Sequence, residues 1–201
     1  RGETCDARGR CDPLYVFADA TGARMPVVLS DDPEALEVAV RVQYAVARRG
    51  LPAPASFRRW AGAALAGRRA VAEVGVRVVD REEGAALNHR YRGKDGPTNV
   101  LSFPFDPPPG VDLPWLGELV LCAPVVEEEA RSQGKAPRSH WAHLVVHGIL
   151  HLVGYDHGSE AEAAVMERVE VEVLRGLGID DPYGDRDNER DNERDNDRDN
   201  V

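Results

Sequence analysis

A run of closely spaced histidines between His140 and His157 constrains this chain more than any other feature. His147 and His151 are four residues apart, so on a helix their side chains lie about 40° apart around the axis and roughly 6 Å apart along it. Gly154 follows at a position where a left-handed residue can end the helix and turn the chain. His157 can then return to the two helical imidazoles, and the sequence predicts a helix, a glycine turn and a shared metal site.

Three imidazoles that leave a fourth position open are typical of a catalytic zinc site, whereas structural zinc sites use four protein ligands. Borderline-soft nitrogen donors also favour zinc over harder ions. We therefore predict one Zn²⁺ per chain, bound by His147, His151 and His157.

The same histidine spacing occurs in metzincin proteases, which carry a glutamate directly after the first ligand as the general base. This chain has Gly148 at that position. The pattern therefore predicts a metal site and gives little support to a zinc peptidase.

A second polar cluster lies between Asn88 and Phe103. Arg90, Arg92 and Lys94 alternate along it and are followed by an Asp-Gly-Pro turn. A guanidinium can bind a phosphate through two parallel hydrogen bonds, so these cations suit a phosphate substrate near a metal. Taken alone, a segment of this kind is more often a solvated loop.

Four more residues are candidates for the same site. Arg138 adds positive charge just before the histidine helix and could line one wall of a cleft. Glu118 begins an expected strand, where it could be a base or an edge-strand charge. His143 and Asp156 could assist a zinc ligand or act as a base. A hydrogen-bonded core histidine and a turn cap are their alternative interpretations.

Hydrophobic periodicity predicts one α+β domain over residues 35–183. Alternating valines and apolar runs predict four strands, at Val38–Val42, Val74–Val78, 99–103 and 116–122. Helical patterns predict five helices: one capped by Ser56 and reaching Leu65, then 82–89, 124–132, 138–153 and 159–177.

Charge and composition restrict the remaining classes. The 201 residues carry a formal charge of −10, which argues against broad nucleic-acid binding but is compatible with a local basic cleft. No apolar run suits a membrane span, no secretion signal opens the chain, and three cysteines cannot form a disulfide framework, so we expect a cytoplasmic protein. Residues 1–34 are predicted to be a poorly ordered extension, and the charged repeat at 184–201 to be disordered.

With both polar clusters in view, the sequence resembles the YbeY family of bacterial and organellar endoribonucleases and rRNA maturation factors. The resemblance covers about residues 37–183. Its strongest segments are YRGKDGPTNVLSFPF at 91–105, LGELVLCAPVV at 116–126 and HWAHLVVHGILHLVGYDH at 140–157.

The resemblance implies an α+β fold with a mixed sheet flanked by helices. It also implies a single-strand-specific metallo-endoribonuclease acting in 16S rRNA 3′-end maturation and ribosome quality control, with RNA and the small ribosomal subunit or its proteins as partners. The family's zinc ligands correspond to His147, His151 and His157, and its essential arginine to Arg92. Arg90, Lys94 and Arg138 are expected to line the RNA cleft.

Two other functions stay open at this point. A ribosome assembly factor could use the zinc only to hold the third histidine in place, without catalysis. A zinc peptidase would share the ligand spacing but would lack the usual glutamate. Chelator-sensitive cleavage of RNA or of peptides separates the three hypotheses.

Overall fold

The computed structural model describes residues 37–111 and 113–184, so the predictions for residues 1–34 and for the tail after 184 lie outside the described part. Four strands and five helices follow one another in this part and confirm the predicted α+β class. Among these described helices, none has both the length and the apolar character required to cross a bilayer.

The sheet is mixed, with the strand order β1-β2-β4-β3. β1 (Glu37–Tyr44) and β4 (Trp115–Cys122) run parallel to β2 (Val71–Val79), whereas β3 (Val100–Pro104) pairs with β4 in the antiparallel direction. Alternate residues of a strand point to opposite faces, and three alternate valines of β2 point into the main core. These valines are at most 2% exposed: Val74, Val76 and Val78.

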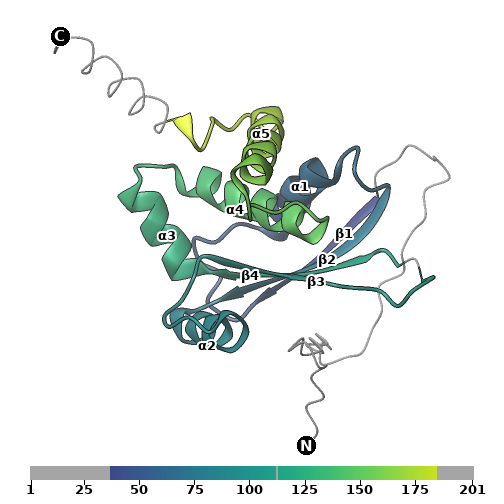
Figure 1. Cartoon of the computed structure of the whole chain (residues 1–201). Coiled ribbons are helices and arrows are strands. Elements are labelled where there is room, and N and C mark those ends of the chain that lie inside the picture. The colour runs from purple at the N-terminus through teal and green to yellow at the C-terminus, as the bar shows by residue number, and fades with distance from the viewer. Residues whose placement is uncertain (1–36, 112, 185–201) are drawn as a thin grey trace, which may run out of the picture. The chain divides into compact units, whose positions relative to one another are not determined.

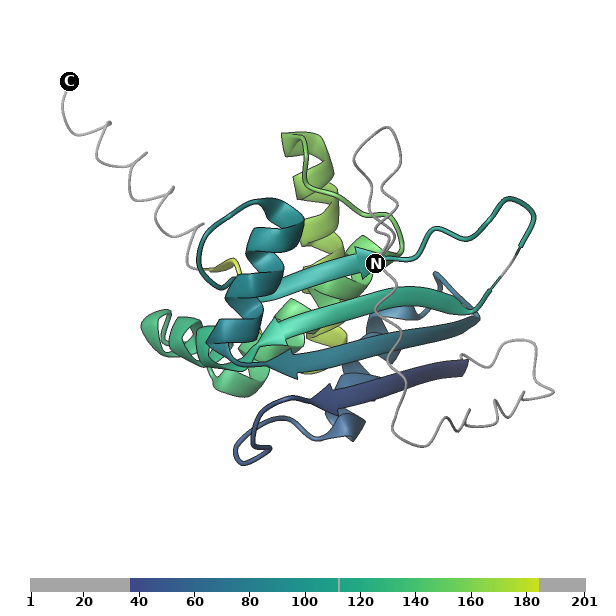
Figure 2. The same cartoon turned by 90° about the horizontal axis from the view of Figure 1, so that it is seen from below.

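The helices cover the two faces of the sheet unequally (Figure 1). α1 (Pro54–Leu65) and α4 (Pro137–Leu152) pack on one face, and α5 (Glu160–Gly176) packs on the outer side of α4. α3 (Ala123–Ser132) follows β4 directly, and α2 (Arg81–Arg92) lies on the opposite face. Figure 2, which looks onto that face, shows α2 covering the end toward which β2 and β4 point.

The main core lies between the sheet and α1 and α4. Phe57 of α1 packs edge-on against Trp60 and against Trp141 of α4, with ring centroids 5.6 and 6.1 Å apart. Ten of the 16 residues of α4 are buried, so this helix is the centre of the domain. A helix enclosed in this way holds its side chains in fixed positions, which suits it to carry a metal site.

Three local predictions need correction. Helix α1 begins after Ala53, not Ser56, because Pro54 occupies the first turn, where its fixed φ angle and missing N–H fit best. Helix α2 extends to Arg92 instead of ending at residue 89. β4 is an interior strand, so Glu118 is not an edge-strand charge.

Candidate metal centre

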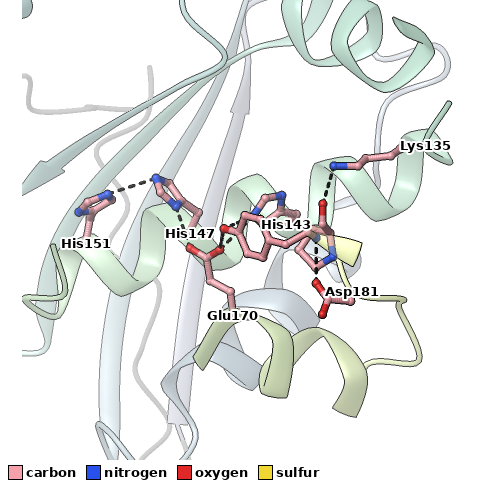
Figure 3. Close-up of polar contacts among 8 residues, drawn as sticks. Lys135, His143, His147, His151, Glu170 and Asp181 are labelled. Carbon is pink, nitrogen blue, oxygen red and sulfur yellow. Dashed lines mark hydrogen bonds and ion pairs between the residues drawn. The ribbon is translucent and has the colours of Figure 1, made fainter. Parts of the chain in front are cut away.

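The three predicted histidine ligands converge. His147 and His151 on α4 and His157 in the following loop each offer one ring nitrogen, and these nitrogens all lie within 4.8 Å of one another. The Nε2 atoms of His147 and His151 are 3.2 Å apart, and Figure 3 shows their rings facing each other. This is the only group of three or more metal-ligating side chains found among the described residues.

The turn after α4 brings the third histidine back to the first two. α4 ends at Leu152, and Gly154 has a φ angle of 94°, a left-handed conformation that other residues rarely adopt. The N–H of Tyr155 donates to the carbonyl oxygen of Leu150 at 3.0 Å and closes the helix end. The carboxylate of Asp156 accepts from the N–H of His157 at 2.8 Å, so Asp156 caps this turn.

The geometry fits a metal ion with nitrogen ligands. Bonds of about 2.0–2.1 Å in a tetrahedral arrangement place two ligand nitrogens about 3.3 Å apart, close to the separation between His147 and His151. His157 is exposed whereas the other two rings are half-buried, which leaves one side of the cluster open to solvent. Burial, together with the neighbouring His147 and His157, lowers the pKa of His151 and favours the neutral, metal-binding form.

Glu170 of α5 supports this cluster from behind, and the sequence reasoning missed it. Its side chain is fully buried, and its Oε1 accepts from Nδ1–H of His147 at 2.8 Å (Figure 3). Burial alone would raise the pKa of Glu170, but hydrogen bonds from His143, His147 and Tyr183 outweigh burial and lower the pKa to about 2. Glu170 is therefore a buried anion that accepts hydrogen bonds from three side chains.

The sequence does contain a pattern that indicates a buried position for Glu170. Its neighbours four residues before and after it, Met166 and Leu174, are apolar residues of the same helix face, and both are buried. A glutamate in the middle of an apolar stripe must have a buried partner. The pattern therefore pointed to a partner that the histidine helix could have supplied.

Comparison with known proteins gives the family. The family model described as Endoribonuclease YbeY matches residues 55–178. A curated relative named Endoribonuclease YbeY, from Alkalilimnicola ehrlichii, is 60% identical over 164 residues, which cover 79% of this chain and 97% of the relative. The chain belongs to the YbeY family of endoribonucleases. Endoribonucleases are hydrolases that act on RNA, and the relatives bear this name. This chain is therefore an enzyme of that class.

Two further matches are similar in extent. The relative of the same name from Stenotrophomonas maltophilia is 57% identical over 155 residues, covering 75% of this chain and 95% of the relative. A protein from Thermotoga maritima, solved in solution, aligns with a TM-score of 0.48 and 28% identity, covering 69% of this chain and 91% of that chain.

The cations of the second cluster lie at the end of α2. Arg90 and Arg92 belong to its last helical turn, and Lys94 is exposed in the turn that follows. Asn88 is buried and its side-chain amide donates to the carbonyl oxygens of Lys94 and Gly96, at 3.3 and 2.9 Å. This segment therefore consists of a helix end and a solvent-exposed turn that Asn88 braces.

The edge strand β3 lies between this helix end and the histidines. Phe103 of β3 faces α2, where its ring meets Tyr91 edge-on with centroids 4.9 Å apart. Ser102, which precedes Phe103 in β3, faces α4. Its Oγ lies 3.3 Å from the position that a Cβ atom on residue 148 would occupy. The arginine-bearing end of α2 and His147 thus lie on the two faces of the same edge strand.

Glu118 lies apart from the histidines. It shares a sheet face with Val120 and Cys122, which belong to the cluster under α2, while Leu119 points into the core beneath α4. Burial raises the pKa of Glu118 to about 7, against a smaller opposing effect of Arg77. The structure therefore does not bring this carboxyl together with the metal ligands.

The two earlier histidines of α4 are held by carboxylates. The imidazole of His140, 4% exposed, bonds through Nε2 to Oε2 of Glu129 at 2.8 Å, and burial lowers its pKa despite this partner. His143 bonds through Nε2 to Oε2 of Glu170 at 3.0 Å. His143 is thus linked to His147 through one shared carboxylate, whereas His140 belongs to a separate contact with α3.

Arg138 lies at the other end of α4 from the metal ligands. It lines a pocket of about 320 Å³ together with Arg59 of α1 and the chain segment 177–179 that follows α5. Nine residues of helix separate Arg138 from His147, or about 14 Å along the axis. The structure therefore does not bring Arg138 together with the metal ligands.

Gly148 explains why the glutamate of the metzincin pattern is missing. A Cβ at this position would lie 2.7 Å from Cδ2 of Leu119 in β4, closer than any real contact between carbons. The helix therefore packs against the sheet at the point where a protease would place its general base. This close approach argues against the peptidase hypothesis on packing as well as on sequence.

Proposed function

We propose that this chain is a zinc-dependent endoribonuclease of the cytoplasm that cleaves single-stranded RNA, in maturation of the small-subunit rRNA 3′ end and in ribosome quality control. The observation that carries the proposal is the convergence of His147, His151 and His157 with an open side, in a chain of the YbeY family. The curated relatives support the RNA substrate by their printed names.

His147, His151 and His157 would hold one zinc ion per chain through neutral ring nitrogens. When bound, the ion supplies Lewis acidity at the scissile phosphodiester. The exposed side of His157 leaves room for the phosphate to approach, while the buried carboxylate of Glu170 keeps His147 oriented.

Arg92 would stabilise the negative charge that develops on the phosphate. Its guanidinium can bind two phosphate oxygens at once, and it lies exposed at the rigid end of α2. Arg90 and Lys94 would bind neighbouring phosphates. An RNA strand passing around the β3 edge would contact both the end of α2 and the histidines, which lie on opposite faces of that strand.

Trp141 and Tyr91 do not offer a stacking platform for bases. Trp141 is 2% exposed within the core, and Tyr91 packs on Phe103. Selection of single-stranded over double-stranded RNA would then come from the limited space around the β3 edge, since a duplex is broader than an unpaired strand. The proposed specificity thus depends on shape and charge more than on base contacts.

The decisive experiment measures zinc content and RNA cleavage in His147→Ala. We expect less than one-tenth of the wild-type zinc and loss of chelator-sensitive cleavage of a short unpaired RNA, with a matched duplex uncut by either protein. His89→Ala is the control for zinc content, because His89 is an exposed histidine of α2 that pairs with Asp95 in the following loop. Full zinc and full activity in His147→Ala would exclude the proposal.

The same measurements separate the alternatives. Zinc binding with specific rRNA binding but no chelator-sensitive cleavage would favour a non-catalytic assembly factor. Chelator-sensitive digestion of casein would favour a peptidase instead.

A further inference from the structure

The buried carboxylate of Glu170 connects the metal centre to the segment that follows α5. Its Oε1 accepts from His147, and its Oε2 accepts from Nε2–H of His143 at 3.0 Å and from the hydroxyl of Tyr183. Figure 3 shows the carboxylate between the two histidine rings. Glu170 therefore receives three donors from two parts of the chain.

These contacts fix which nitrogen of His147 carries the proton. A carboxylate can only accept hydrogen bonds, so Nδ1 of His147 must be the donor, and in the neutral ring Nε2 keeps its lone pair. That Nε2 is the atom that lies 3.2 Å from Nε2 of His151, on the side where the three histidines converge. Glu170 thus selects the tautomer and the ring orientation that a metal requires.

Tyr183 is held in place by its own contacts. The backbone N–H of Tyr183 donates to Oδ1 of Asp181 at 2.8 Å, and Nζ of Lys135 donates to the carbonyl oxygen of Pro182 at 2.8 Å. The Tyr183 ring also meets the His143 ring edge-on, with centroids 5.4 Å apart. Segment 181–183 is therefore fastened to α3–α4 and to the back of the histidine cluster.

We propose that Glu170 is the positioning residue of the metal centre and that Tyr183 completes it, so that segment 181–183 is a working part of the site. This segment lies beyond residue 178, where the match to the family model ends. The inference rests on the metal site of the proposed function. It adds a chain of contacts, Tyr183 to Glu170 to His147, through which the C-terminal segment sets metal affinity.

The test compares zinc affinity in Glu170→Gln, Tyr183→Phe and the wild type, using competition with a chromophoric chelator. Loss of a partner that orients a metal ligand weakens binding by about 10–100-fold, and we expect a loss in this range for Glu170→Gln. For Tyr183→Phe we expect a several-fold loss, because the carboxylate keeps its two histidine donors. Glu172→Gln, an exposed glutamate two residues along α5, should bind zinc as the wild type does.

A second readout detects positioning directly. In the metal-free wild type, ¹⁵N NMR should show His147 protonated at Nδ1, and Glu170→Gln should lose this preference because an amide can present its NH₂ group to the ring. A purely structural role would lower the melting temperature but leave both the tautomer and the zinc affinity unchanged.

The outcomes are distinct. Unchanged zinc affinity in both variants would overturn the inference, and unchanged affinity in Tyr183→Phe alone would overturn the role of segment 181–183. If Glu170→Gln does not fold, Tyr183→Phe decides, since it removes one hydroxyl only. Absence of zinc binding by the wild type would instead overturn the proposed function.

Discussion

At the scale of single residues, the buried Glu170 and the half-buried Glu118 have opposite protonation. Glu170 is surrounded by three donors and stays ionised, whereas Glu118 is half-buried without a hydrogen-bond donor strong enough to offset burial, and its pKa rises to about 7. The folded protein therefore keeps the proton of Glu118 up to about pH 7, while the unfolded chain releases it near 4.5. The contribution of Glu118 to stability is complete below pH 4.5 and is lost as the pH rises through 7.

Glu118→Gln should remove this loss of folding stability at high pH, because an amide has no proton to release. A pKa shift from 4.5 to about 7 corresponds to about 3 kcal/mol for a fully buried group. Partial exposure reduces the expected gain in the free energy of unfolding to about 1 kcal/mol at pH 8. Urea unfolding at pH 5 and pH 8 measures the difference, with Glu172→Gln as the exposed control. If the substitution changes the free energy of unfolding equally at both pH values, Glu118 does not titrate in this range.

Residue-level prediction succeeded for side chains whose spacing along one helix and turn is fixed by local geometry. The distances between His147, His151 and His157 follow from helical rise and a glycine turn, so the sequence was sufficient for the metal cluster. Glu170 comes from another helix, and its contact with His147 depends on how α5 packs across α4. Periodicity gives the buried face of α5 but not the residue that it meets.

At the scale of elements, the contact between α4 and the sheet is tightest at Gly148. Gly148→Ala should destabilise the fold by up to about 2 kcal/mol, because overpacking against Leu119 costs about 1–3 kcal/mol and the better helix propensity of alanine returns about 1 kcal/mol. Gly176→Ala is a matched control, since a Cβ there meets nothing within 4 Å. Thermal unfolding of both variants measures the difference, and a Gly148→Ala protein as stable as Gly176→Ala would contradict the close approach.

Element boundaries were predicted less well than element types, for a local reason. Both Ser56 and Pro54 favour a helix start, and the proline decides because its φ angle is already helical. In α2, Asp80 caps the start by accepting from the N–H of Glu83 at 2.9 Å, and the helix continues until Gly93 takes a φ of 64°. This glycine was visible in the sequence, and it ends the helix one turn later than the apolar pattern suggested.

At the scale of the whole domain, strand order decides which residues can act together. The sequence gives no strand order, so it could not place β4 in the interior or β3 at the edge. The edge position of β3 allows groups on both faces of the sheet to reach one extended ligand, which local patterns along the chain cannot reveal. In the proposed function, this edge position would bring Arg92 within reach of an RNA bound at the histidines.

Arg92→Ala should lower kcat/KM for single-stranded RNA by about 10²–10³-fold, the usual effect of removing one donor that stabilises transition-state charge. Zinc content and melting temperature should not change, because Arg92 is exposed and lies outside the histidine cluster. Arg92→Lys should recover only part of the activity, since an ammonium cannot bind two phosphate oxygens in a fixed plane. Arg49→Ala is the control, because this exposed arginine follows β1 at the opposite edge of the sheet. Equal losses in Arg92→Ala and Arg49→Ala would point to general attraction of RNA by positive charge, and would remove the specific role of the β3 edge.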